Sequence, residues 1–381
     1  MEPIVIIGSG MAGYGLLREL RKLDRETPVT VITADEGTAY AKPSLSNALA
    51  TGKTPEQLAN QTAAQISASM NAEVLTHTRV IRIDTAAQQV ETDQGSVAYS
   101  RLVLALGADP IAHGVTGSAA ESIYSVNDLG DYTRFRSALN GKKKVAILGG
   151  GLIGCEFAND LVAAGYGAAV VHLGTSPLER VLPAAIAQRL GESLAAAGVV
   201  WHFSHRAISA EVTDEGIALT LDDGTVVKAD VVLSAIGLRS RISLAQATGV
   251  NTGRGVMVDR LLQTNVPGIY AMGDCAEVEG WVLPYVQPLL QQARALAATL
   301  AGTPTPVNYP SMPVVVKTPA LPLTVATPAP NQPGQWRTEM EAACTVARFQ
   351  DEQGNLHGFV LCGHAPALRS ELTKQMPALL A

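Results

Sequence analysis

Aromatic residues and basic runs are scarce in this sequence. Phe, Trp and Tyr make up 4% of the 381 residues, and the formal net charge is −6. The lysines at 142–144 form only a short basic run. Proteins that bind single-stranded nucleic acid combine a basic groove with aromatic stacking surfaces. We therefore expect no nucleic-acid partner.

Cysteine is also sparse, because the chain has only four and none forms a CxxC pair. Their spacing fits neither a zinc site nor a disulfide framework. His172, His202 and His205 show no metal-like grouping, so we interpret them as structural or surface residues and expect no metal. Cys155 and Cys275 adjoin motifs described below, and we expect both to be small buried residues.

Long apolar runs are missing as well. No uninterrupted hydrophobic stretch approaches the roughly 18 residues that a membrane-spanning helix needs. A strand is predicted to begin by Ile4, which leaves no room for a signal peptide. We therefore expect a cytoplasmic protein with no membrane span.

Glycine is plentiful instead, and two similar units are built around glycine-rich turns. The first unit has an apolar run at 4–8, typical of a strand buried on both faces, followed by the turn, a helix near 14–23 and a strand at 28–33. About 140 residues later the order recurs at 144–148, 155–164 and 168–172. This β-turn-α-β pattern predicts an α/β protein with two Rossmann-like dinucleotide-binding domains.

The first turn reads Gly8-Ser9-Gly10-Met11-Ala12-Gly13. Its three glycines allow a tight turn, a close approach of the backbone to a pyrophosphate, and packing of the helix on the strand. The free N–H groups at the helix N-terminus favour an anion. An acidic ribose ligand is expected after the following strand, where either Asp35 or Glu36 fits.

The second turn reads Gly149-Gly-Gly151-Leu152-Ile153-Gly154 and predicts a second dinucleotide site. At the end of the following strand stand His172, Leu173 and Gly174, with no acid. A site that binds the 2′-phosphate of NADPH would need an arginine near this strand end, and the nearest arginine in the sequence is Arg180. We favour NADH over NADPH because no basic pair occupies the strand end.

The remaining segments point to a smaller C-terminal domain. Residues 303–333 are rich in proline and are interpreted as its boundary. Strands near 344–349 and 356–361 and a short terminal helix are predicted after it. We expect this third domain to be of the α+β class.

The order of motifs resembles the two-dinucleotide flavoprotein reductases of the glutathione-reductase fold. The matching segments are GSGMAG, LVLALGA at 102–108, GGGLIGCE at 149–156, VVLSAIGLR at 231–239 and IYAMGDCAE at 269–277. The resemblance implies a discontinuous FAD domain. It suggests four segments: 1–112 for the first half of the FAD domain, 113–243 for the NAD(P) domain, 244–306 for the second FAD half and 307–381 for the C-terminal domain.

Two further segments narrow the resemblance. Disulfide reductases carry a redox-active cysteine pair beside the flavin, whereas residues 40–46 here read YAKPSLS. This segment looks like that of reductases serving one-electron iron carriers. The segment KTPALPL at 317–323 resembles rubredoxin reductases and the similar flavorubredoxin reductases. GLIGCEFANDL looks nearer to the first kind, and LPYVQP at 283–288 looks nearer to the second.

The resemblance also assigns residues to the cofactors. FAD contacts are implied for Ser9 to Ala12 of the first glycine-rich turn and for Thr33, Ala34, Asp35, Lys42, Val80, Asp274 and Val286. Cofactor binding is expected also for the glycines of both turns and for Ala105, Gly107, Gly237 and Gly273. Asp274 would bind the ribityl chain and the pyrophosphate region. Lys42, Glu156 and Lys317 are the candidate catalytic residues. A Lys317–Glu156 pair near the flavin N5 edge would position the nicotinamide and balance charge.

These expectations lead to a rubredoxin–NAD(+) reductase activity in which NADH reduces FAD and rubredoxin receives single electrons. A reductase for flavorubredoxin in nitric oxide detoxification is the alternative. A flavin-binding redox sensor that responds to NADH by a change of conformation or association is a third hypothesis. The acceptor in the first two cases would be rubredoxin or a rubredoxin-domain protein.

Overall fold

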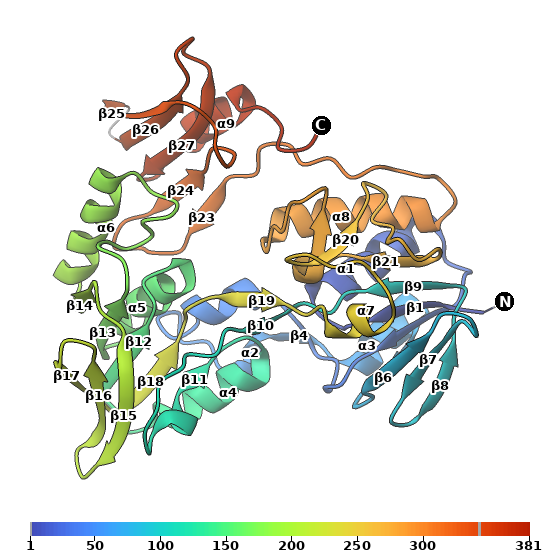
Figure 1. The fold of residues 1–381 in the computed structure, drawn as a ribbon, viewed down its shortest axis with the longest axis horizontal. Coiled ribbons are helices and arrows are strands. Elements are labelled where there is room, and N and C mark those ends of the chain that lie inside the picture. The colour runs from blue at the N-terminus through green and yellow to red at the C-terminus, as the bar shows by residue number, and fades with distance from the viewer. Residues whose placement is uncertain (1, 342–343) are drawn as a thin grey trace.

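The computed structural model describes residues 2–341 and 344–381 and shows three parts (Figure 1). The first part is built on a five-stranded parallel sheet in the order β21-β9-β1-β2-β5. Its strands are β1 (Ile4–Ile7), β2 (Val29–Ile32), β5 (Glu73–Leu75), β9 (Arg101–Leu104) and β21 (Ile269–Ala271). Because β21 belongs to this sheet, the chain returns to the first part after it has formed the second.

Helices and a small sheet cover the two faces of this parallel sheet. Helix α1 (Met11–Leu23) packs against α8 (Val286–Leu300), while an antiparallel sheet of β6, β7 and β8 lies on the other side (Figure 1). All four residues of β1 are at most 6% exposed. The apolar run at 4–7 is therefore buried on both faces, as its lack of alternation predicted.

Shorter elements complete the first part and its links. They are β3 (Ala39–Tyr40), the 3-10 helix η1 (Lys42–Asn47), α2 (Pro55–Leu58), β4 (Ala59–Gln61), α3 (Ala63–Met70), β6 (Val80–Asp84), β7 (Gln89–Thr92), β8 (Gly95–Ala98), β10 (Ala108–Pro110), β19 (Leu238–Ser240), α7 (Ser243–Ala247), β20 (Val256–Val258), η3 (Gly273–Cys275) and β22 (Ala276–Val278). Strands β10 and β19 pair antiparallel where the chain leaves and re-enters this part.

The second part repeats the plan with a parallel sheet in the order β11-β18-β12-β13-β14. Alternate residues of β12 enter two different cores. Val145 and Ile147 pack among the helices, whereas Ala146 and Leu148 pack against the antiparallel sheet β15-β16-β17. Its elements are η2 (Ala120–Ser122), β11 (Tyr124–Ser125), α4 (Leu129–Ala138), β12 (Lys144–Leu148), α5 (Leu152–Ala163), β13 (Gly167–His172), α6 (Ala184–Ala196), β14 (Val199–Phe203), β15 (Ala207–Thr213), β16 (Gly216–Leu221), β17 (Val226–Ala229) and β18 (Val231–Ser234).

The third part is an antiparallel sheet in the order β23-β24-β27-β26-β25, with one helix. Its elements are β23 (Val314–Val316), β24 (Leu323–Ala326), β25 (Gln335–Glu341), β26 (Cys344–Gln350), β27 (Leu356–Cys362) and α9 (Pro366–Gln375). The α/β class with two dinucleotide-binding folds and a small α+β domain is confirmed.

The proline-rich segment is more than a boundary, so that interpretation was incomplete. It contributes β23 and β24, and the prolines at 313, 319, 322 and 328 lie between or beside these strands. Proline lacks a backbone N–H and is therefore tolerated where a strand starts or stops. Both predicted helices of the glycine-rich units also begin three residues earlier than expected, at Met11 and Leu152.

The third part packs on the second part through one face of its sheet. Leu323, Val325 and Val360 belong to the same buried cluster as Ile147 and Phe157 of the second part. The other face packs against α9. Among the described residues, no helix is long and apolar enough to cross a membrane.

Leu323 provides a test of this shared core. It is 1% exposed, so Leu323→Ala should lower the free energy of unfolding by about 2–5 kcal/mol. Leu23 on α1 is 60% exposed, and Leu23→Ala should change the same quantity by less than about 0.5 kcal/mol. Guanidinium denaturation measures both. Equal effects would contradict burial of β24 against the second part.

Candidate functional site

The first glycine-rich turn has the geometry of a phosphate cradle. A Cβ on Gly13 would lie 1.9 Å from the carbonyl oxygen of Gly8, and Gly8 itself has φ +117°. No atom lies within 4 Å of the place where a Cβ on Gly10 would stand. Helix α1 begins here with no side-chain cap and no acid in its first turn. Its first N–H groups therefore have no side-chain cap, and a helix N-terminus of this kind favours an anion.

Asp35 is held beside this cradle. Its Oδ1 accepts hydrogen bonds from Thr33 Oγ1 at 2.7 Å and from the Gly37 N–H at 2.9 Å. Ser9 of the cradle donates to Thr33 Oγ1 at 2.8 Å. The sequence left Asp35 and Glu36 as alternatives for the ribose ligand. This network favours Asp35, because it fixes that carboxylate next to the turn.

Lys42 and Asp274 both lie in the first part, close enough for the charge of each to affect the other, and Lys42 also contacts the second part. Lys42 Nζ donates to Asn127 Oδ1 at 2.7 Å, and Asn127 in turn donates to the carbonyl of Ala108 at 2.9 Å. Burial lowers the pKa of Lys42, and the charge of Asp274 opposes that shift. Burial likewise raises the pKa of Asp274 against the effect of Lys42. Asn127 belongs to no recognisable motif, so no sequence pattern pointed to it.

Two further predicted residues lie at the same cradle. A Cβ on Gly273 would come within 2.7 Å of the Ala12 side chain, so Gly273 brings the start of η3 against α1. The carbonyl of Ala105 lies 2.2 Å from the ideal Cβ position of Gly8. The backbone turns through positive φ at Gly107 (+72°) and at Gly237 (+120°). Val80 starts β6 and Val286 starts α8, where their cofactor contacts stay predictions.

The second glycine-rich turn reproduces the first. A Cβ on Gly154 would lie 1.9 Å from the carbonyl oxygen of Gly149, and the corresponding position on Gly151 is open. Helix α5 begins at Leu152, again with no side-chain cap and no acid in its first turn. The pattern that predicted two dinucleotide sites therefore folds into two cradles of the same shape.

Glu156, Ser46 and Lys317 meet where segments of all three parts come together. Lys317 Nζ lies 2.6 Å from Glu156 Oε2, and the Glu156 side chain is 1% exposed. Ser46 Oγ donates to Glu156 Oε2 at 2.5 Å and accepts from Lys317 Nζ at 2.9 Å. The Lys317 backbone N–H also donates to Glu156 Oε1 at 3.0 Å. The expected pair forms, and Ser46, which lies in the YAKPSLS segment and has no predicted role, is a third member.

Two neighbours of Glu156 on α5 hold other segments in place. Asn159 Oδ1 accepts the backbone N–H of Ala320 at 3.0 Å. Both oxygens of Asp160 accept backbone N–H groups, from Leu49 at 3.0 Å and from Ala50 at 2.9 Å. Burial raises the pKa of Asp160, and these hydrogen bonds oppose the shift. One face of α5 therefore binds segments from both other parts of the chain.

The family models match nearly the whole chain. The model described as "Pyridine nucleotide-disulphide oxidoreductase" matches residues 2–298, and "Rubredoxin binding C-terminal domain" matches residues 306–376.

The chain belongs to the pyridine nucleotide-disulphide oxidoreductase family.

Relatives support this membership over the full length. Rubredoxin-NAD(+) reductase of Alcanivorax borkumensis is 46% identical over 381 residues and covers 100% of both chains. Nitric oxide reductase FlRd-NAD(+) reductase of Aeromonas salmonicida is 39% identical, covering 99% of this chain and 97% of its own. The crystal structure of a ferredoxin reductase from Rhodopseudomonas palustris has a TM-score of 0.89 at 26% identity, covering 99% and 96%.

The disulphide of the family name has no counterpart in the described part of this chain. All four cysteines there are free and buried. Burial raises the pKa of Cys155 to about 12 and that of Cys275 to about 11, so neither thiol is a ready nucleophile. The prediction that these two residues are buried is confirmed.

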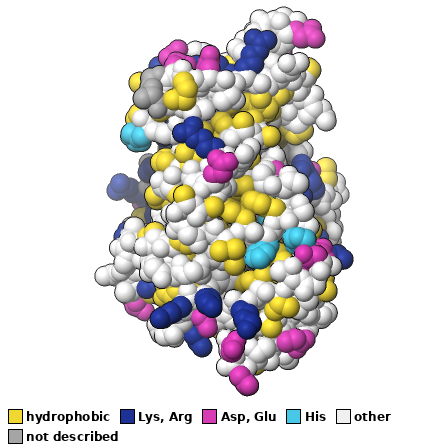
Figure 2. All heavy atoms as spheres, turned by 90° about the vertical axis from the view of Figure 1, so that its left-hand side faces the viewer, with side chains coloured by type: hydrophobic (Ala, Val, Ile, Leu, Met, Phe, Trp, Pro, Cys, Tyr) yellow, Lys and Arg dark blue, Asp and Glu magenta, His cyan; other side chains and the backbone are white. Residues whose placement is uncertain are grey.

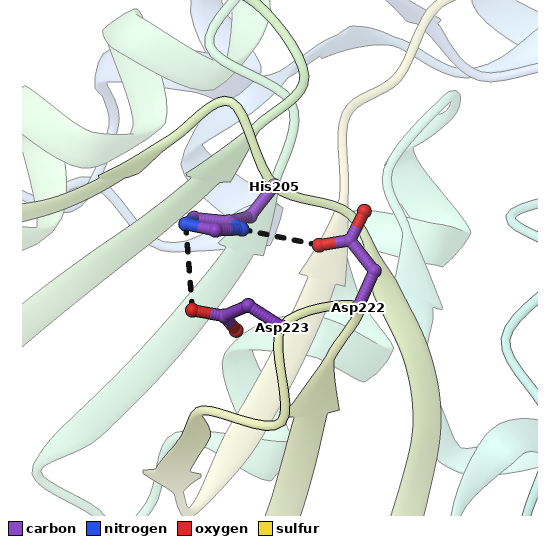
Figure 3. A group of neighbouring side chains, drawn as sticks. All are labelled: His205, Asp222 and Asp223. Carbon is purple, nitrogen blue, oxygen red and sulfur yellow. Dashed lines mark hydrogen bonds and ion pairs between the residues drawn. The ribbon is translucent and has the colours of Figure 1, made fainter.

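One interpretation of the histidines was wrong. His205 does have a metal-like grouping, because its ring lies between the carboxylates of Asp222 and Asp223 (Figure 3). The Nδ1–Oδ1 distance to Asp222 is 3.1 Å, and the Nε2–Oδ2 distance to Asp223 is 3.6 Å. The sequence analysis missed the group because it forms only when the β16–β17 turn folds beside the residues after β14. The hydrogen bond between the His205 ring and Asp222, with Asp223 close to the other ring nitrogen, accounts for the arrangement.

The buried pair yields a stability prediction. Lys317→Met should lower the free energy of unfolding by about 2–4 kcal/mol, because it leaves the Glu156 charge buried without its partner. Adding Glu156→Gln should recover part of this loss. Chemical denaturation of the single and double variants measures the coupling.

The exposed pair Lys228–Glu215 is a matched control, since its side chains are 66% and 72% exposed. Lys228→Met should lower the free energy of unfolding by only about 0–1 kcal/mol. A loss from Lys317→Met no larger than this would show that the charge of Lys317 does not compensate Glu156.

Proposed function

We propose that this protein is a reductase that transfers electrons from NADH through FAD to rubredoxin. The match of residues 306–376 to a rubredoxin-binding domain carries the proposal, because it adds an acceptor to a chain with two dinucleotide cradles. The relative that is 46% identical over its full length is named for the same reaction. Location in the cytoplasm and the four-segment domain division belong to this proposal.

The residues of the first cradle suit FAD. The open approach to Gly10 and the uncapped start of α1 fit a pyrophosphate. We assign Asp35 to the adenosine ribose, and Lys42 and Asp274 to the pyrophosphate and ribityl region. FAD, when bound, accepts two electrons from NADH and releases them one at a time. With no cysteine relay among the described residues, the electrons leave from the flavin itself.

The second cradle is assigned to NADH, and the group of Glu156, Ser46 and Lys317 to the region where the two cofactors meet. Glu156 is buried and hydrogen-bonded on both oxygens, so its position is fixed by the fold. Lys317 holds a positive charge there. In this role Lys317 balances negative charge on a reduced cofactor, while Glu156 orients the lysine and the nicotinamide.

Reduction of flavorubredoxin is the second candidate function. The 39% identical relative named "Nitric oxide reductase FlRd-NAD(+) reductase" aligns with 99% of this chain. Relatives of both names therefore match this chain over nearly its whole length. The iron centre offered by either partner would be of the rubredoxin kind. The acceptor, and not the flavin chemistry, distinguishes these functions.

A mixing experiment tests the proposal. Oxidised rubredoxin should bleach rapidly with NADH and enzyme. The rubredoxin domain of a flavorubredoxin, at equal concentration and under the same conditions, should bleach more slowly. Bleaching no faster than with NADH alone would contradict the proposal. If NADH instead changes the oligomeric state without turnover of any carrier, the redox-sensor hypothesis gains support.

Lys42 provides a test of the FAD assignment. Lys42→Met should raise the dissociation constant for FAD by about tenfold or more, because it removes a half-buried cation near Asp274 and the proposed pyrophosphate. Fluorescence quenching during titration of the apoprotein with FAD measures this constant. Lys53 is exposed, and Lys53→Met should leave it unchanged. Equal affinities for the two variants would remove Lys42 from the FAD site.

A further inference from the structure

The end of β13 is the position where a dinucleotide-binding fold usually carries an acidic residue that binds the ribose, but this strand end has no acid. In dinucleotide-binding folds, a carboxylate near the end of the second strand hydrogen-bonds the 2′-hydroxyl of the adenosine ribose. Strand β13 ends at His172, and Leu173 and Gly174 follow. The imidazole Nδ1 of His172 accepts the Gly150 N–H at 3.1 Å, so this strand end lies directly against the second cradle.

A carboxylate reaches this place from further along the chain. An ideal Cβ on Gly174 would lie 2.1 Å from Oε1 and 2.2 Å from Oε2 of Glu179. The backbone N–H of Thr175 donates to Glu179 Oε2 at 3.0 Å. The Glu179 side chain therefore stands where a side chain at position 174 would stand. Glu179 is exposed, so its remaining lone pairs are open to a ligand.

A strained turn brings Glu179 back to the strand end. Leu178 has φ +53°, which is unfavourable for a leucine, yet its side chain is only 5% exposed. Its N–H donates to the carbonyl of Gly150 at 3.0 Å. The core around Leu178 and this hydrogen bond hold the turn on the second glycine-rich loop. The position of Glu179 is therefore coupled to the cradle and is not that of a free surface side chain.

We propose that Glu179 binds the 2′-hydroxyl of the adenosine ribose of NADH and excludes the 2′-phosphate of NADPH. The inference rests on the proposed function in taking the second cradle as the nicotinamide dinucleotide site. A carboxylate accepts hydrogen bonds from a ribose hydroxyl and repels a phosphate dianion. Glu179 thereby makes the nucleotide selection that the strand end itself does not encode.

Binding of two nucleotide fragments tests the proposal without electron transfer. ADP-ribose and 2′-phospho-ADP-ribose are titrated by calorimetry into enzyme loaded with FAD, so that the first cradle is filled. The wild-type protein should bind ADP-ribose at least tenfold more tightly. Glu179→Gln should reduce this ratio about tenfold, by weakening ADP-ribose and strengthening the phosphorylated fragment.

Two other variants isolate the contact. Glu192 is an exposed acid of the same part, bonded to Gln188 at 2.9 Å, and Glu192→Gln should leave the ratio unchanged. Gly174→Ala keeps the Glu179 carboxylate but forces it from the strand end. As a single variant it should weaken ADP-ribose binding several-fold. In the double variant with Glu179→Gln it should weaken binding little further. Retained FAD absorbance shows that each variant is folded.

The outcomes separate this inference from the function it extends. Three results would overturn it. One is a ratio of the two affinities that Glu179→Gln leaves unchanged, and another is a wild-type preference for the phosphorylated fragment. The third is an equal effect of Gly174→Ala with and without Glu179→Gln. Rubredoxin reduction that persists alongside such a result leaves the proposed function standing. A selective response to Glu179→Gln in an enzyme that fails to reduce rubredoxin would reject the proposed function alone.

Discussion

The polar face of α5 is the constraint on which the arrangement of the three parts depends. Glu156, Asn159 and Asp160 are at most 4% exposed and stand at positions that share one helical face. They receive hydrogen bonds from η1 and the residues after it, and from the loop after β23. Buried carboxylates without partners are costly, so these side chains favour the arrangement in which every segment is in place.

The two cradles could be predicted because their geometry is local. A strand, three glycines at fixed spacing and a helix lie within one short stretch of chain, and the contact of Gly13 with Gly8 leaves no room for a side chain. The helices begin at Met11 and Leu152, inside the motif, because the glycine-rich turn itself supplies the first helical residues. The boundaries were missed because side-chain periodicity is visible only after the first turn of a helix.

Groups assembled from distant segments could not be predicted in the same way. Asn127 bonds to Lys42 across 85 residues, and Glu179 reaches the end of β13 only because Leu178 adopts a left-handed conformation. No spacing rule places either residue. The Lys317–Glu156 pair was expected only through resemblance to known reductases, since the two residues are 161 positions apart. The sequence shows a carboxylate and a cation at these positions, but no spacing between them predicts that they form an ion pair.

The third part constrains how a protein partner reaches the molecule. Within the described residues, one face of its sheet packs on the second part and the other packs against α9, so the surfaces open to a partner are the exposed side of α9, the exposed edge strand β25 and the loops. The edge strand β23 leads directly into Lys317, so the proposed rubredoxin-binding domain supplies the cation of the Lys317–Glu156 ion pair. Figure 2 shows charges of both signs interspersed with apolar side chains on the face that forms the left-hand side of Figure 1. With a net charge of −6 as well, attraction to an acidic carrier would have to come from local contacts and not from the overall field.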